Sequence, residues 1–303
     1  MARRWRRSAA RWSRPGGGDK TAAMVLLQLA CVAIVALYVG LRLRGEAKPW
    51  PVLRRLALLA VAAWIGEDSC IRGYGFYQYS PSLWPRLDQV PLVIVLIWPA
   101  VVHSAWDLAA GLTRGRPSLR PLVGGLVVLA DASLIEPVAV QAGLWSWNAP
   151  GLFAVPPIGV LGWAFFAALA MAGWQRGEAS RRPGLVEGAA VVAAPLGSHL
   201  LLIGAWWGGC RWVSGPIPPW PAVGLLALVT VGAAGLLHHR QARRHIPLRH
   251  LLLRLPPSLF FLVLLLLHGR DQLALCAWAA AFAPPYLALL DGGSRRGAAL
   301  PRA

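Results

Sequence analysis

Residues 134–163 read LIEPVAVQAGLWSWNAPGLFAVPPIGVLGW, and this stretch decides how the rest of the chain is interpreted. An acid and a proline, Glu136 and Pro137, stand inside an apolar run, and two tryptophans one residue apart, Trp145 and Trp147, follow it. A simple membrane anchor needs only apolar residues. Here two apolar segments meet at a short, nearly uncharged loop that is rich in aromatics. The pattern indicates a site at a membrane surface, where carboxylates and aromatic side chains come together.

The composition places the chain among integral membrane proteins. Of its 303 residues 57% are hydrophobic and 14% are charged, and the mean hydropathy is +0.53. Apolar runs of roughly 20 residues, the length of a helix that crosses the hydrocarbon core, recur along the whole chain. They are continuously apolar and do not alternate as β-barrel strands do. The sequence therefore predicts an all-α, polytopic helical bundle with eight or nine transmembrane helices.

We expect one integral membrane domain, residues 21–290, between a basic and disordered tail, 1–20, and a cytoplasmic tail, 291–303. The second expected span is the least apolar, because it must run through Glu67 and Asp68 to be long enough. The expected spans are 21–41, 53–70, 90–110, 121–142, 154–174, 185–208, 220–237, 250–268 and 272–290.

The loops alternate between basic and charge-poor. The charge-poor loops are 71–89, 143–153, 209–219 and 269–271. By the positive-inside rule, the basic loops and the C-terminus then lie in the cytoplasm. The expected location is the inner membrane of the cell. These basic loops account for the net charge of +18, so no nucleic-acid partner is expected. Nine spans would put the basic tail outside, against the rule. Either the first run is not a simple span, or the start codon is misassigned, or the tail is translocated.

Four of the carboxylates in expected spans are candidate site residues, because a charge inside a membrane costs a few kcal/mol and needs a reason. They are Glu67, Asp68, Asp131 and Glu136. Asp131 and Glu136 are five residues apart and point to different sides of a helix, so a shared site would combine Glu67 or Asp68 with one of them. Burial favours the protonated form of a carboxylic acid, which can donate a proton. The alternative is that each acid is a buried group satisfied by Arg72, by a tyrosine or by a backbone group.

Aromatic residues crowd the segment IRGYGFYQY, residues 71–79, where Gly73 and Gly75 allow the chain to turn. Aromatics at a membrane interface are usually belt residues, but those that follow buried acids can line a pocket and stabilise a cation. The candidate lining residues are Tyr74, Tyr77, Tyr79, Trp145, Trp147 and Trp163.

The histidines and cysteines carry weaker signals. His103 and Asp107 are four residues apart and predict a structural pair, and His199 stands alone in its span. His238, His239 and His245 belong to a basic loop rather than to an iron-binding set. The four cysteines form no C-x-x-C pair, so neither a metal site nor a disulfide framework is expected.

Residues 60–175 resemble the carotenoid-biosynthesis membrane hydratases, the carotenoid 1,2-hydratases that act on γ-carotene or bisanhydrobacterioruberin. The matching residues are an acid before a proline, a W-x-W, a Val-Pro and a Gly-Trp, preceded by an aromatic G-x-Y-x-Y block, a further Val-Pro and a Trp. They are Asp131, Glu136-Pro137, Gly143 to Trp147, Gly151, Val155-Pro156, Leu161 to Trp163, Gly73 to Tyr79, Val90-Pro91 and Trp98. The chain departs from the family pattern at Glu136, where the family has Asp, at Gly159, where it tends to have Asn, and at Gly73 and Tyr74, where it tends to have Pro-Phe.

The resemblance implies a hydro-lyase that adds water to a terminal isoprenoid C=C of a carotenoid, with no cofactor. Glu67, Asp68, Asp131 or Glu136 would supply the acid and the base that orients water, and the six candidate aromatics would shelter a carbocation. The partner would be a polyene dissolved in the lipid bilayer. Two other functions stay open: a transporter or channel that uses the acids as proton or ion sites, and a scaffold without chemistry. The oligomeric state is open as well.

Overall fold

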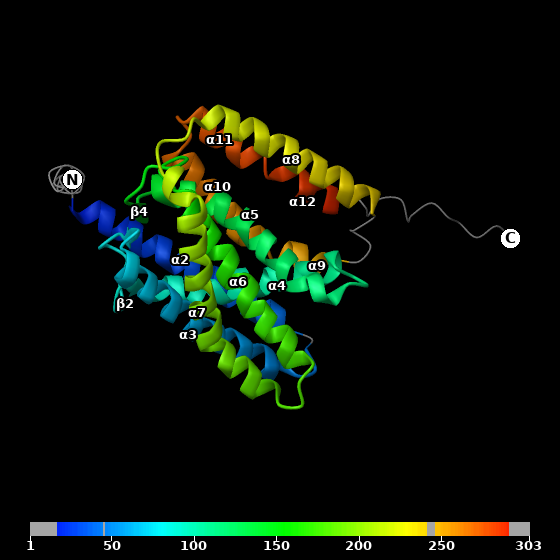
Figure 1. The fold of residues 1–303 in the computed structure, drawn as a ribbon. Helices are drawn as coiled ribbons and strands as arrows, with labels where there is room; N and C mark the ends of the chain where they lie inside the picture. The colour runs from blue at the N-terminus through cyan, green and yellow to red at the C-terminus, as the bar shows by residue number, and fades with distance from the viewer. Residues whose placement is uncertain (1–16, 45, 241–245, 291–303) are drawn as a thin grey trace.

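A computed structural model describes residues 17–44, 46–240 and 246–290 as a bundle of helices (Figure 1). In this part of the chain, eight helical segments are long and apolar enough to cross a membrane. The prediction of an all-α polytopic membrane protein is confirmed. The longer helices are α2 (Gly17–Leu43), α3 (Pro49–Tyr74), α4 (Leu92–Leu112), α5 (Arg120–Gln141), α6 (Pro157–Glu178), α7 (Pro183–Gly208) and α8 (Pro219–His239).

Helix α3 is the expected second span, but it is not among the eight apolar segments. It is 26 residues long and carries charges near both ends, with Arg54 and Arg55 close to its start and Glu67, Asp68 and Arg72 close to its end. The two arginines donate to Glu187 of α7, whose side chain is fully buried. These pairs explain how a charged helix is held against the apolar helices around it.

Helix α2 begins at Gly17, so residues 17–20 of the predicted tail, 1–20, are part of this helix. The other tail residues, 1–16, lie outside the described part of the chain, as does the predicted C-terminal tail, 291–303.

The last two expected spans are each broken into two helices. Residues 250–268 form α9 (Leu248–Leu252) and α10 (Leu255–His268), and residues 272–290 form α11 (Leu273–Ala280) and α12 (Ala283–Leu290). A proline pair follows each break, Pro256-Pro257 in α10 and Pro284-Pro285 in α12. Proline lacks a backbone N–H and fits only the first turn of a helix, so a new helix starts there.

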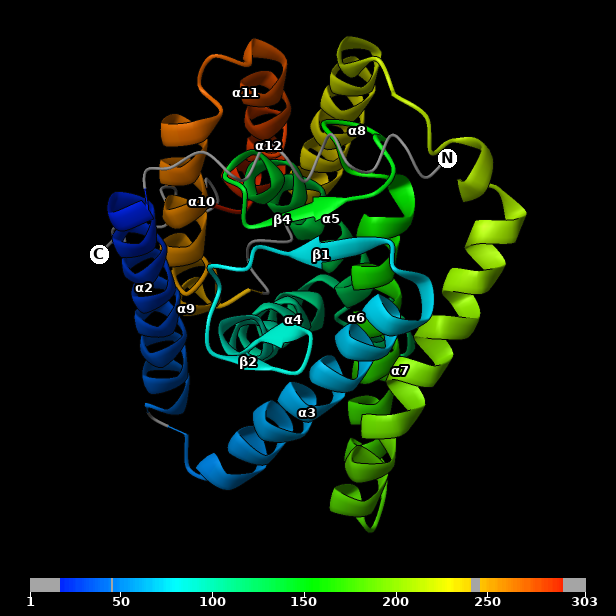
Figure 2. The same cartoon turned by 90° about the vertical axis from the view of Figure 1, so that its left-hand side faces the viewer.

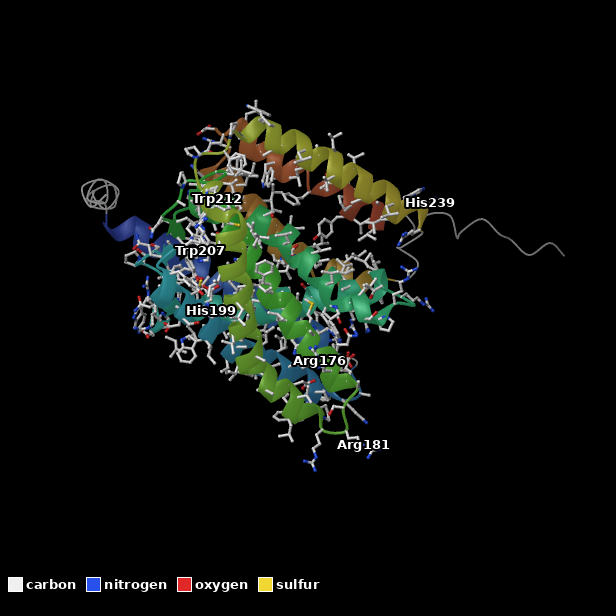
Figure 3. The ribbon with its side chains drawn as sticks, in the orientation of Figure 1. Arg176, Arg181, His199, Trp207, Trp212 and His239 are labelled. Atoms are coloured by element: carbon white, nitrogen blue, oxygen red, sulfur yellow. The ribbon has the colours of Figure 1, made fainter. Side chains whose placement is uncertain are left out.

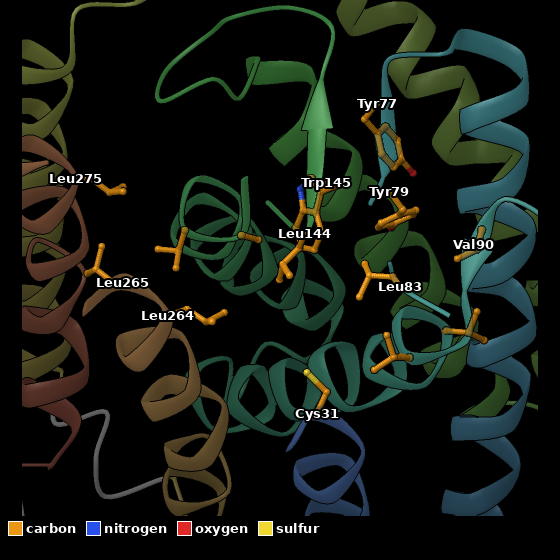
Figure 4. Packing of buried hydrophobic residues seen from close by; sticks show 14 residues of the cluster. Cys31, Tyr77, Tyr79, Leu83, Val90, Leu144, Trp145, Leu264, Leu265 and Leu275 are labelled. Carbon is orange, nitrogen blue, oxygen red and sulfur yellow. The ribbon is translucent and has the colours of Figure 1, made fainter. Parts of the chain in front are cut away.

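The helices pack in sequence-adjacent pairs, with α6 between α5 and α7, and α4 beside both α3 and α5. Helix α2 packs on α4, α10 packs on α5, and α8 pairs with α11 and α12 along one side of the bundle (Figures 1 and 2). A buried cluster between α2, α4, α5 and α10 joins Cys31, Val93, Val138 and Leu264 (Figure 4).

The charge-poor loops gather at one end of the bundle. Strands β1 (Tyr77–Tyr79), β2 (Arg86–Leu87), β3 (Val90–Pro91) and β4 (Trp145–Trp147) lie there, with the short helix η2 (Cys210–Trp212). Figure 3 shows Trp207 and Trp212 at this end, and Arg181 and His239 at the other. The alternation of loop charge along the sequence therefore corresponds to two separate ends in space.

Candidate active site

Two short strands bring the aromatic motifs of the sequence together. Strand β1 pairs antiparallel with β4, so that Tyr77 lies opposite Trp147 and Tyr79 lies opposite Trp145 (Figure 2). Alternate residues of a strand point to the same face, and here the four aromatics share the face that covers the bundle interior. Tyr77, Tyr79 and Trp145 are buried, and Trp147 is half-buried. Figure 4 shows three of the four, Tyr77, Tyr79 and Trp145, close to one another.

Glu67, on α3, is one centre of this arrangement. Tyr79 donates its hydroxyl to Glu67 Oε2 at 2.8 Å, Tyr77 donates to the same oxygen, and Trp98 Nε1 of α4 donates to Oε1 at 3.0 Å. Burial, and then the adjacent Glu67, raise the pKa of Tyr77 and of Tyr79 well above their ordinary value, so both hydroxyls keep their protons. No cation appears among these hydrogen-bond donors: the partners of Glu67 are neutral.

Glu136, on α5, is the second centre and is 2% exposed. Trp145 and Trp147 donate their indole N–H to its Oε2 at 2.7 and 2.9 Å, and Trp163 of α6 donates to its Oε1 at 2.8 Å. An indole nitrogen is only a donor. The three partners of Glu136 therefore suit an ionised carboxylate, which is only an acceptor.

The six aromatic donors form three ring pairs, and each pair joins the two centres. Tyr77 lies against Trp147, with ring centroids 4.7 Å apart, and Tyr79 lies edge-on to Trp145 at 5.8 Å. Trp98 lies against Trp163 at 4.5 Å. If a ring that donates to one carboxylate moves, it must therefore displace the ring that donates to the other carboxylate.

The two centres are built by the same local plan. Each acid lies near the end of a helix, and the chain then passes a glycine with positive φ, Gly75 (58°) or Gly143 (73°), before it enters the strand. Tyr77 and Tyr79 follow Glu67 by 10 and 12 residues, and Trp98 follows it by 31. Around Glu136 the three tryptophans follow by 9, 11 and 27 residues.

A local two-fold relation follows from this plan. If Tyr77 corresponds to Trp145, and Tyr79 to Trp147, a two-fold axis between Gln78 and Ser146 requires Tyr77 to face Trp147 and Tyr79 to face Trp145. That is the observed register. The two centres thus share one order along the chain, with the acid on a helix (α3 or α5), two donors on the strand that follows (β1 or β4) and one donor on the next long helix (α4 or α6), although the sequence shows no repeat of fixed period.

Both acids line one cavity of about 150 Å³, which we call the carboxylate cavity. Its walls are almost wholly apolar and come from α2 to α7 and from α10. Five of the six candidate aromatics line it, namely Tyr77, Tyr79, Trp145, Trp147 and Trp163, together with Trp98. Gly159 leaves room for one of them, because a Cβ there would lie 2.7 Å from the ring of Trp147.

A family comparison agrees with this arrangement. The model of a family described as carotenoid biosynthesis protein matches residues 21–232 of the chain. The chain belongs to this family. Both carboxylate centres of this carotenoid biosynthesis protein lie inside the matched region, whereas α9 to α12 lie beyond it. No curated protein and no solved structure matches the chain.

The other candidate residues of this carotenoid biosynthesis protein lie apart from the cavity. Asp68 accepts from Arg72 Nε at 2.9 Å and from the backbone N–H of Gln89 at 3.1 Å, on the exposed side of α3. Asp131 accepts from Arg254, with Oδ2 2.6 Å from its Nη2, and from Tyr286 at 3.1 Å. Glu67 and Glu136 are the two acids that the fold brings together.

Tyr74 also lies beside the cavity rather than in its lining. Its hydroxyl meets Nδ1 of His199 at 3.0 Å, and its ring stacks on Phe76 with centroids 5.1 Å apart. His199 itself lines the cavity, and its Nε2 meets Ser69 Oγ at 2.8 Å. The histidine that stands alone in its span is therefore held at both ring nitrogens.

The other histidines lie away from the cavity. His103 and Asp107 form the predicted pair, at 3.6 Å, and Tyr38 meets His103 Nδ1 at 2.8 Å. His238 and His239 are exposed at the end of α8, and His245 lies outside the described residues. Among the residues that the structure describes, no three His, Cys, Asp or Glu side chains are grouped to hold a metal ion.

Trp98, which donates to Glu67, is not among the candidate site residues that the sequence predicts. It belongs to a family motif, but its neighbours in the sequence are apolar and give no sign of a buried acid beside it. The signal that finds it is the repeated plan, since Trp98 stands to Glu67 as Trp163 stands to Glu136.

Proposed function

We propose that this carotenoid biosynthesis protein is a hydratase, which adds water to a terminal isoprenoid C=C of a carotenoid within the membrane. The observation that carries the proposal is the pair of buried carboxylates, Glu67 and Glu136, which face one cavity walled by aromatic rings. The cavity suits the end of a polyene rather than its whole length. Its apolar walls match a substrate that is already dissolved in the bilayer.

Glu67 is the proton donor in this proposal. A tyrosine hydroxyl both donates and accepts hydrogen bonds, so either Tyr77 or Tyr79 can turn to accept from a protonated Glu67 while the other still donates to it. The protonated form thus keeps its hydrogen bonds. Glu67 gives its proton to one carbon of the terminal C=C, and the π-electron pair becomes the new C–H bond. The neighbouring carbon is left as a tertiary carbocation.

Glu136 is the anion that faces this cation. Its three indole donors favour the ionised form. A fixed negative charge in a water-poor cavity stabilises a developing positive charge more strongly than it would in water. The ring faces of the lining tryptophans and tyrosines add to this stabilisation, because their quadrupoles attract cations.

A water molecule completes the reaction. Its oxygen bonds to the carbocation, and the extra proton passes to Glu136 and returns to Glu67 before the next turnover. The balance is one C=C and one water in, and one tertiary alcohol out. No oxidant or reductant is consumed.

Asp68 and Asp131 are left out of the proposed catalytic pair, because each is matched with an arginine. They follow the scaffold alternative, in which every acid has a structural partner. Glu67 and Glu136 also have hydrogen-bond partners, but these are neutral, and a cavity lies beside both acids. We further propose that the protein lies in the inner membrane with its C-terminus in the cytoplasm, because the basic loops share one end of the bundle.

Expression in a host that makes lycopene or γ-carotene tests the hydratase. We expect the wild-type chain to yield a carotenoid heavier by one water, as measured by mass spectrometry, and Glu67→Gln and Glu136→Gln to yield none at equal protein level. Trp106→Phe is a matched control, because Trp106 is buried outside the cavity lining. An unchanged product yield in Glu136→Gln would contradict the assigned role.

A further inference from the structure

A second cavity, of about 120 Å³, adjoins the carboxylate cavity. Cys31, Ile97, Ile135 and Phe261 are among the residues that line both. The second cavity extends between α2, α4, α5 and α10 toward Asp131 and Arg254, and we call it the arginine cavity. A ligand that enters the carboxylate cavity along these shared walls also reaches the arginine cavity.

Arg254 joins four parts of the bundle. Its Nη1 donates to Ser104 Oγ of α4 at 2.9 Å, and its Nη2 donates to Asp131 Oδ2 of α5 at 2.6 Å and to the Tyr286 hydroxyl of α12 at 2.9 Å. Its Nε, however, has no hydrogen-bond partner. In the described part of the chain two other buried side-chain atoms share this state, on Ser80 and His250, and neither residue lines either cavity.

An unpartnered N–H in an apolar interior carries the cost of its lost hydration, because no protein acceptor replaces the water it gave up. An acceptor oxygen supplied by a ligand would recover that cost. Asp131 already neutralises the guanidinium, so the cavity has no net charge to attract an anion. The group that fits is a neutral oxygen, a hydroxyl or a carbonyl, on an otherwise apolar molecule.

We propose that the arginine cavity is a subsite for an oxygen-bearing polyene, with Arg254 Nε–H donating to that oxygen. The inference rests on the proposed function only for the class of ligand. Arg254, Tyr286 and the whole of α10 lie beyond the residues that the family model matches. The subsite therefore combines residues of the matched region with C-terminal helices outside it, and it selects among polyenes by their oxygen content.

Binding of two probes to the purified full-length protein in lipid nanodiscs tests the subsite. The probes are retinol and the hydrocarbon that lacks its hydroxyl, and quenching of tryptophan fluorescence reports their affinity. We expect the wild type to prefer retinol by about tenfold, the gain of one hydrogen bond to a charged group. Equal affinity for the two probes would mean that Arg254 Nε–H donates to water rather than to the ligand, and this result would overturn the proposal.

Arg254→Lys is the informative variant, because it keeps the positive charge beside Asp131 but places a methylene where Nε stood. We expect the preference for retinol to fall to within about twofold while the affinity for the hydrocarbon stays unchanged. Arg55→Lys is the matched control, since Arg55 is a half-buried arginine paired with glutamates and lines neither cavity. A retinol preference that survives in Arg254→Lys would overturn the proposal.

A second variant covers the case in which Arg254→Lys does not fold. Ala100 lines the arginine cavity and not the carboxylate cavity, so Ala100→Leu fills the subsite and leaves the ion pair in place. It should abolish the preference for retinol as well. These readouts are independent of turnover: absence of hydrated product would end the proposed function, whereas the retinol preference decides the subsite.

Discussion

The rings of Trp98 and Trp163 lie 4.5 Å apart between centroids, and each ring donates its N–H to a different buried carboxylate. This contact joins α4 to α6 and the Glu67 centre to the Glu136 centre. The two acids are therefore not independent sites that share a cavity. They form a unit, and a change at either tryptophan is expected to reach both.

Trp98→Phe tests this coupling. Phenylalanine keeps an aromatic ring beside Trp163 but removes the donor to Glu67 Oε1, so the carboxyl group is less well oriented. We expect the hydration rate to fall about tenfold, the effect of one lost hydrogen bond on a buried acid. Trp163→Phe and the double variant complete a double-mutant cycle. We expect the effects of the two substitutions on the hydration rate not to be additive, with an interaction energy near 1 kcal/mol. Strictly additive effects would argue against a joined unit.

Glu67→Gln and Glu136→Gln should differ in stability although both abolish hydration. A glutamine at 136 turns an N–H toward three donor-only indoles, whereas a glutamine at 67 meets tyrosine hydroxyls that can accept. We expect Glu136→Gln to lose about 2–3 kcal/mol and Glu67→Gln less than about 1 kcal/mol. Thermal unfolding in detergent compares them, and equal losses of Tm would contradict the roles that the donors assign.

Gly159→Ala tests the space under Trp147. The added methyl group would lie 2.7 Å from the indole, so the ring must move away from Glu136. We expect a loss of about 1–3 kcal/mol in stability and a marked fall in hydration. Trp147→Phe in the same chain should recover much of the stability, because the smaller ring leaves room. Gly188→Ala is the control, since nothing lies near that position, and a similar loss there would show a general helix effect.

Asp68→Asn and Asp131→Asn separate catalysis from structure. Asp68 pairs with Arg72 on the exposed side of α3, so its loss should leave hydration within about twofold and stability within about 1 kcal/mol. Asp131 neutralises the buried Arg254, and Asp131→Asn should cost about 3–5 kcal/mol by leaving that charge unpaired. Assays of product per folded protein distinguish the two cases. A loss of activity in Asp68→Asn without a loss of fold would return Asp68 to the catalytic set.

The sequence predicts most of the fold because continuous apolar runs of helical length have few alternatives. It does not show the breaks at Arg254 and near Pro284, where hydropathy stays high although proline interrupts the hydrogen bonds. The sequence does not predict the β1–β4 pairing, since each strand has only three residues and gains its partner through the packing of α3 against α4 and α7 and of α5 against α4 and α6.

The site was predicted in outline and not in detail. Glu67 and Asp68 are neighbours on one helix, about 100° apart around its axis, and the sequence does not say which of them faces inward. The structure turns Glu67 toward Trp98 and Asp68 toward Gln89. Asp131 is a candidate from the sequence because nothing near it reveals its ion-pair partner. That partner, Arg254, lies 123 residues away, in a segment with no resemblance to the family motifs.

Hydration by the purified protein tests the central claim most directly. The protein in nanodiscs is given γ-carotene or lycopene in water enriched in heavy oxygen and deuterium, and the product is analysed by mass spectrometry. Protonation followed by capture of water predicts one heavy oxygen on the tertiary carbon and one deuterium on its neighbour, in the wild type and not in Glu67→Gln. A folded wild-type protein that binds these polyenes and yields no labelled alcohol would contradict it.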